Sequence, residues 1–156
     1  MPANLTKQLR RTAHVIKQSV TLVYRHPRRA LLIVRMANWL VLFTVMMRLL
    51  PMPRALQLIS APVRSGVNDA NEKELASAVD ALLATDVFVF RPSCWKRAAI
   101  LHRYLALQGI ESRINFGMKK DVDGGFSGHA WLERSGQAIF ETTPPDYTIT
   151  YSFPSQ

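Results

Sequence analysis

Residues 127–143 have the sequence SGHAWLERSGQAIFETT, which decides what kind of fold the chain can have. Its first part alternates, so that His129 and Trp131 share one face of a strand and Ala130 and Leu132 share the other. Ser135-Gly136 is a turn signal, and Gln137 to Thr143 is the next predicted strand. The stretch therefore predicts an antiparallel hairpin with a histidine in its first strand.

The length of the turn decides which residue lies opposite His129. A three-residue loop, 134–136 with Gly136 in the left-handed region, pairs Glu133 with Gln137 and places Glu141 opposite His129. Cross-strand neighbours have Cβ atoms about 4.5–5.5 Å apart, which is near enough for a carboxylate to reach an imidazole. A two-residue turn shifts the register by one and places Thr142 there instead. In the first register, the acid would orient the histidine.

A helix and a further strand are predicted upstream of this hairpin. Ser93 is the expected N-cap of the helix, which places Cys94 in the first turn, and Gly109 is its stop. Residues 113–118 alternate with period two, and the turn signal at 123–125 joins them to the hairpin. Residues 147–153 form a fourth strand or an ordered tail.

The N-terminal half is predicted to be helical. The expected helices are a basic amphipathic one over 5–23, an apolar one over 30–50, a short one over 54–60 and another from Asn71 to about Thr85, after a linker at 62–71. Helices followed by an antiparallel meander predict an α+β fold. We expect a basic helical N-terminal region over 1–64 and a core domain over 65–156.

Charge divides the chain in the same way. Residues 1–68 contain eleven Lys and Arg and no acid, whereas residues 69–156 contain nine Lys and Arg and eleven acids. An anionic partner or membrane surface is therefore expected for the N-terminal helices. Nucleic acid is not, because no base-stacking aromatics are interleaved with the basic residues. The longest charge-free run, residues 36–47, is shorter than the ~20 residues of a membrane span, which favours a buried or membrane-touching helix.

The single cysteine, Cys94, excludes an intramolecular disulfide and fits a reducing compartment such as the cytoplasm. No cleavable signal peptide is evident. No cofactor or metal is expected. His102 lies two turns along the helix from Cys94 and on a different side of it, which disfavours a metal site shared by the two. The acids at 121 and 123 lack the remaining ligands of a calcium-binding loop. At a helix N-terminus the dipole favours the thiolate, and the backbone N–H of Cys94 can help to bind an oxyanion.

These residues resemble the transglutaminase-like superfamily, in which a cysteine opens a helix, a strand carries H-A-W-x-E and an acid follows on the next strand. Within it, CWKRAAILHRYLALQGIESRINFGMKK and FSGHAWLERSGQAIFE resemble the leader peptidases of lasso peptide biosynthesis, the protease half of the microcin-processing B protein. The resemblance covers roughly residues 72–143 and includes Arg97, Gly109 and Gly117. It departs at Glu141, where the family usually has Asp, and at Trp95, where a smaller aliphatic residue is usual.

The resemblance implies a cysteine peptidase that cuts a ribosomally made precursor between leader and core. Cys94 would be the nucleophile, His129 the base and Glu141 the orienting acid, with Asp146 as the reserve candidate; Arg97 and Trp131 would bind substrate. The implied partners are the leader peptide, a separate leader-recognition protein and a lasso cyclase, since residues 1–70 do not resemble the family's recognition domain. The alternatives are another acyl transfer at the same site, a non-catalytic scaffold, or a membrane-associated role of the basic helices.

Overall fold

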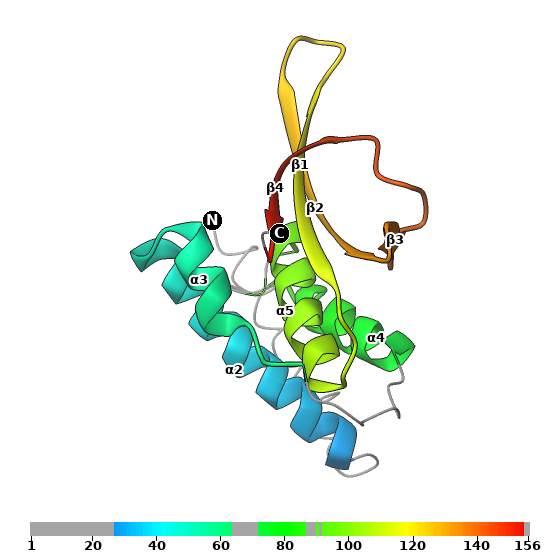
Figure 1. Cartoon of the computed structure of the whole chain (residues 1–156). Helices are drawn as coiled ribbons and strands as arrows, with labels where there is room; N and C mark the ends of the chain where they lie inside the picture. Colours follow the sequence, from blue (N-terminus) through cyan, green and yellow to red (C-terminus); the bar gives the residue numbers. More distant parts are fainter. Residues whose placement is uncertain (1–26, 64–71, 87–89, 91, 155–156) are drawn as a thin grey trace, which may run out of the picture.

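The structure, a computed structural model, describes residues 27–63, 72–86, 90 and 92–154. Its helices are α2 (Pro27–Leu49), α3 (Met52–Ile59), α4 (Glu72–Leu83) and α5 (Cys94–Leu107), and its strands are β1 (Arg113–Lys120), β2 (Phe126–Arg134), β3 (Gln137–Ile139) and β4 (Thr148–Phe153). The predicted α+β class is confirmed, because helices pack on an antiparallel sheet (Figure 1). The helix predicted over 5–23 lies outside the described residues. So do residues 64–71 of the predicted linker, which include Asn71, the expected start of the next helix.

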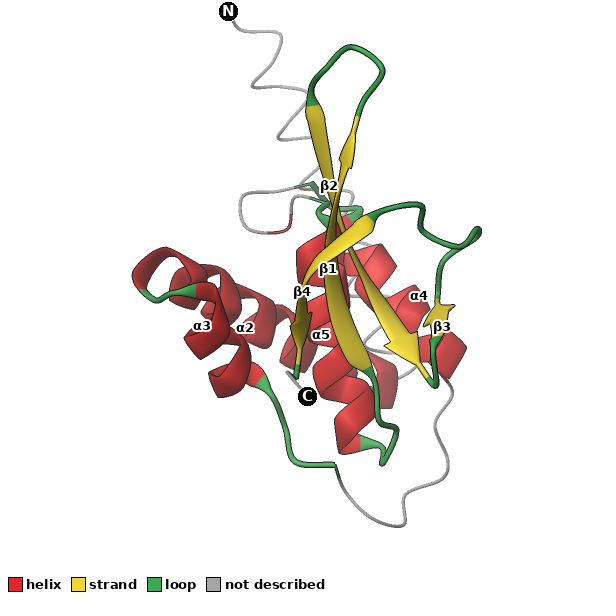
Figure 2. Cartoon of the chain, turned by 45° about the horizontal axis from the view of Figure 1, so that its top comes forward, coloured by secondary structure: helices red, strands yellow, loops and turns green. Residues whose placement is uncertain are grey.

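The strands form one sheet in the order β3-β2-β1-β4, in which every neighbouring pair is antiparallel. The meander expected from the sequence holds for β1, β2 and β3. The chain then crosses the sheet, so that β4 pairs with β1 at the opposite edge from β3 (Figure 2). The hairpin of β1 and β2 extends beyond the body of the molecule as an arm.

The turn between β2 and β3 corrects the predicted register. Ser135 and Gly136 both have positive φ, 52° and 77°, which is the geometry of a two-residue type I′ turn. Arg134 therefore pairs with Gln137 and Leu132 with Ile139, and the three-residue loop is wrong. β3 also ends at Ile139 rather than Thr143, so Glu141 does not reach His129 by strand pairing.

Helix α5 is terminated as its sequence predicts. Gly109 has a φ of 79°, and its N–H donates to the Ala106 carbonyl, while the Ile110 N–H donates to the Leu105 carbonyl. These two bonds form a Schellman motif, which glycine accommodates without the steric cost of a Cβ. At the other end Ser93 occupies the N-cap position in extended geometry, but its side chain makes no capping hydrogen bond.

The hydrophobic core is built around α5, which lies between the sheet and the other helices (Figure 1). Its buried residues include Leu101 and Leu105 of α5 and Ile114 of β1. Met36, Leu40 and Phe43 of α2, at most 1% exposed, belong to the same cluster, and Trp95 packs edge-on against Phe43 with ring centroids 5.4 Å apart. One core thus includes residues on both sides of the boundary expected at 64/65.

A buried histidine on α5 predicts a pH-dependent stability. His102 is 7% exposed, its Nδ1 lies 3.1 Å from Ser112 Oγ, and burial lowers its pKa to about 4. The unfolded chain binds this proton at higher pH than the fold, so stability falls as the pH drops from about 6.5 to about 4, by up to about 3 kcal/mol. In urea unfolding over this pH range, the unfolding free energy of His102→Gln should depend less on pH than that of the unchanged protein. An equal pH dependence in both proteins would show that His102 is not its source.

Candidate active site

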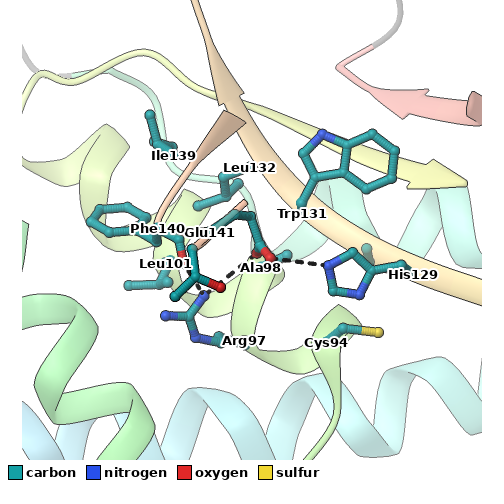
Figure 3. A pocket seen from close by; sticks show the side chains of 12 residues that line it. Cys94, Arg97, Ala98, Leu101, His129, Trp131, Leu132, Ile139, Phe140 and Glu141 are labelled. Atoms are coloured by element: carbon teal, nitrogen blue, oxygen red, sulfur yellow. Dashed lines mark hydrogen bonds and ion pairs between the residues drawn. The ribbon is translucent and has the colours of Figure 1, made fainter. Parts of the chain in front are cut away.

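Three residues predicted from the sequence lie around one cavity. Cys94 is the first residue of α5, His129 is on β2 and Glu141 follows β3. All three line a cavity of about 260 Å³ (Figure 3). Cys94 is half-buried and lines the cavity, so a molecule bound in the cavity can reach its side chain. Cys94 lies in the first turn of α5, at the N-terminal end of the helix, as the sequence predicts.

The histidine and the acid are in direct contact. Nε2 of His129 lies 3.2 Å from Oε2 of Glu141, and both side chains are about three-quarters buried, with 26% and 21% exposed. Figure 3 shows Glu141 and Cys94 approaching the imidazole from different sides. Since Glu141 occupies Nε2, Nδ1 is the nitrogen that remains to take a proton from the thiol. The carboxylate thus favours the tautomer with its proton on Nε2, which leaves Nδ1 free to accept a proton, as a base for the thiol must.

Phe140 provides the backbone geometry that brings Glu141 to His129. Its φ of 63° lies in the left-handed region, which a bulky residue seldom adopts, and it immediately follows the last residue of β3. The chain therefore turns out of the strand at this point, and the acid reaches the imidazole with its side chain. The contact expected from the sequence is present, but the register used to derive it is wrong.

Arg97, one turn along α5 from Cys94, holds this turn in place. Its guanidinium donates to the Phe140 carbonyl at 3.2 Å and lies 3.8 Å from Oε1 of Glu141. On its other side it forms a two-point contact with Asp80 of α4, at 2.6 and 3.2 Å. The hydrogen bond with Asp80 is the main reason why the pKa of Arg97 is raised. These contacts favour a positioning role for Arg97 over the substrate-binding role expected from the sequence.

Aromatic side chains enclose the other side of His129. Its ring is stacked on Trp131, with centroids 6.0 Å apart and an interplanar angle of 14°, and it lies 5.3 Å from the Tyr147 ring. Trp131 is only 5% exposed, so it forms part of the wall of the site. Gly117, opposite His129 on β1, makes room for this packing: a Cβ there would lie 2.7 Å from Tyr147 Cβ and 2.9 Å from the Trp131 ring.

The reserve acid lies elsewhere. Asp146 forms an ion pair with Lys119 of β1, and its side chain is 88% exposed. This pair lowers the pKa of Asp146 through the hydrogen bond from Lys119. Glu141, and not Asp146, is therefore the carboxylate beside His129.

Sequence reasoning missed Asp80 and Tyr147. Asp80 lies in a predicted helix without any motif, and its contact with Arg97 spans 17 positions between two helices, so no local pattern could reveal it. Tyr147 lies in the segment before β4, where only the fold brings it to the histidine. Among the described residues, no group of three or more His, Cys, Asp and Glu side chains could hold a metal ion.

The positioning role of Arg97 can be separated from substrate binding by kinetics. Arg97→Lys keeps the charge but loses the two-point contact with Asp80, so Glu141 and His129 become less well oriented. We expect kcat to fall roughly tenfold and KM to change by less than about twofold, because the interaction acts on the reacting groups. Asp80→Asn should give a smaller loss of the same kind. A raised KM with unchanged kcat would instead support substrate binding.

Comparison with known proteins gives a family match over most of the chain. A model of the transglutaminase-like superfamily matches residues 37–152, which include most of α2 and all of the residues around the cavity. No curated protein and no solved structure matches the chain.

Proposed function

Because the chain belongs to the transglutaminase-like superfamily, which commonly includes cysteine peptidases and acyltransferases, we propose that it is a cysteine peptidase. The observation that carries the proposal is one cavity lined by Cys94, His129 and Glu141, in which Glu141 contacts Nε2 of the imidazole. This arrangement has the nucleophile, base and orienting acid of acyl transfer.

The reaction follows from these positions. The Cys94 thiol gives its proton to Nδ1 of His129, and its sulfur attacks the scissile carbonyl to form a tetrahedral oxyanion. The N–H of Cys94 is available to stabilise that oxyanion at the start of α5. The oxyanion collapses to a thioester as the C–N bond breaks, and the imidazolium protonates the leaving amine. Water, deprotonated by the same imidazole, then attacks the thioester and releases the acid and the free thiol.

For the substrate, we propose the leader peptide of a lasso peptide precursor. The support is the ordered combination of the cysteine-bearing helix, the H-A-W-x-E strand and the glycines at 109 and 117, which resembles leader peptidases of this pathway. The expected partners are a separate leader-recognition protein, which would deliver the precursor, and a cyclase that would close the ring on the freed core. The proposed location is the cytoplasm.

The test is a reconstituted reaction. The full chain is mixed with a lasso peptide precursor and the leader-recognition protein that serves it, and the products are identified by mass spectrometry. A leader and a core produced by one cut support the proposal. Intact precursor together with a thioester on Cys94 from another acyl donor would replace it by a different acyl transfer at the same site.

For the location, we further propose that α2 rests on an anionic membrane surface. The stretch Arg29–Leu49 is long and apolar enough to cross a membrane, yet its inner face is part of the core. Its outer face exposes apolar side chains, among them Val34 at 53%, Leu42 at 45% and Val45 at 46%. Arg35 and Arg48 lie on the same exposed face, and residues 1–68 contain no acid. Such a face suits an interfacial position.

Vesicles of phosphatidylglycerol and phosphatidylcholine can test this location. The protein should co-sediment with them, and Val34→Gln with Leu42→Gln should weaken binding about tenfold, since both changes remove apolar area from the lipid interface. Ile149→Gln, an equally exposed apolar position on β4, should bind like the unchanged protein. Equal binding by the α2 double variant, or no binding by the unchanged chain, would rule the location out.

A further inference from the structure

One edge of β2 lacks a strand partner next to the proposed site. The ladder between β2 and β3 covers only Leu132, Glu133 and Arg134, although β2 begins at Phe126. In the described part of the chain no strand pairs with residues 126–131 on this side, while their other side is paired with β1 throughout. Figure 2 shows β3 beside one end of β2 only. An unpaired edge is a template for another extended chain.

The backbone groups on this edge can be assigned from the turn. A two-residue turn is flanked by a hydrogen-bonded pair, here Arg134 and Gln137, so every second residue of β2 directs its N–H and C=O toward the β3 side. Beyond Leu132 these are Ala130, Gly128 and Phe126. The residues between them, including His129, direct their backbone groups toward β1.

The edge is continuous with the cavity. Ala130 lines the cavity together with His129 and Cys94, and Gly128 is the next outward-directed residue along β2. Gly128 is exposed, and a Cβ there would meet nothing closer than the Gly117 carbonyl oxygen at 3.8 Å. Internal packing therefore does not require glycine at this position. Glycine inside a strand is typical of places where another backbone or a ligand approaches closely.

The arm also offers apolar side chains for a bound chain. Met118 is 47% exposed and Phe126 is 69% exposed. Met118 pairs with Gly128, and Phe126 is two residues further along β2, so both lie on the same face of the arm as Ala130 and Leu132, whose side chains pack into the core around α5. Exposed apolar residues beside an unpaired edge can accept alternate side chains of an extended peptide.

We propose that the free edge of β2 binds the peptide substrate as an added β-strand, with Gly128 and Ala130 forming backbone hydrogen bonds that carry the scissile carbonyl to Cys94. The inference rests on the proposed function and adds to it the conformation of the substrate: an extended peptide segment, with apolar residues where it crosses Met118 and Phe126. Main-chain pairing gives such binding its affinity, and the side-chain contacts give it selectivity.

Leupeptin, a tripeptide aldehyde that forms a hemithioacetal with a reactive thiol, is a suitable probe for the full-length protein. In the adduct, the amide hydrogens of Gly128 and Ala130 should exchange with solvent at least tenfold more slowly in residue-resolved NMR. Those of Ser127 and His129 should be unchanged, because they face β1. A reacted Cys94 with unprotected Gly128 and Ala130 would overturn the added strand and leave the proposed peptidase standing. An unreactive Cys94 would overturn the proposed function and, with it, the added strand.

A second comparison tests the apolar contacts. Phe126→Ser should raise the leupeptin concentration needed for half-maximal adduct formation roughly fivefold, since it removes contact area next to the edge. Val122→Ser at the tip of the arm, where Val122 is fully exposed, should leave it unchanged. Equal effects of the two changes would contradict a role for Phe126 in binding.

Discussion

Cys94→Ala is expected to reduce precursor cleavage by at least about 10³-fold, because it removes the sulfur that would form the thioester in the proposed reaction. The remaining groups, His129 and Glu141, have no nucleophile to activate. The change should leave the fold intact, since alanine is well tolerated in the first turn of a helix and Cys94 is only half-buried. The measurement is the single-turnover rate of leader release, followed by mass spectrometry with saturating recognition protein.

Two controls make this result specific. Cys94→Ser keeps an attacking atom of similar position but higher pKa, so it should also lose most activity. Ser93→Ala, one residue earlier, removes a hydroxyl that makes no capping bond and should retain activity within a few-fold. Full activity of Cys94→Ala would mean that the chain is not a cysteine peptidase, and a scaffold that binds its partners would then explain the preserved fold.

Glu141→Gln should have the second-largest effect, a loss of about 10²–10⁴ in kcat. The change keeps the shape of the side chain but removes the negative charge that holds the imidazole tautomer and stabilises the imidazolium. It also removes the negative charge that lies 3.8 Å from the Arg97 guanidinium. KM should change little, because the lost interaction acts on the proton transfer and not on peptide binding.

Asp146→Asn is the matched control for this prediction. It makes the same carboxylate-to-amide change five positions later, at an exposed side chain whose partner is Lys119, and should leave kcat within about twofold. Glu141→Asp should give an intermediate rate, because the shorter side chain cannot span the 3.2 Å contact from a backbone held by Phe140 and Arg97. The reverse pattern, a large loss with Asp146→Asn and none with Glu141→Gln, would assign the third position to Asp146.

Features that depend on near neighbours in the chain were predictable from the sequence, and features that depend on distant residues were not. Three local features were predicted correctly: the strand around His129, the N-cap position of Ser93 before Cys94, and the helix stop at Gly109. Each depends only on residues a few positions apart in the sequence. The register was not predicted, because Ser135-Gly136 is compatible with both turn lengths and the deciding feature is a serine with φ of 52°. Residues other than glycine seldom adopt that region, so sequence rules disfavour it.

By itself, the sequence determined the class of fold and the chemical types that could meet at a site: a cysteine at a helix start, a strand histidine and a nearby acid. Only the tertiary structure decided how they meet. Phe140, with its left-handed backbone, turns Glu141 toward Nε2 of His129. Arg97 holds this turn in place, and Arg97 is itself bound by Asp80, which lies 17 positions earlier on another helix. The physical reason is range: capping and alternation act between near neighbours in the chain, whereas an ion pair or a ring stack requires the completed packing of separate elements.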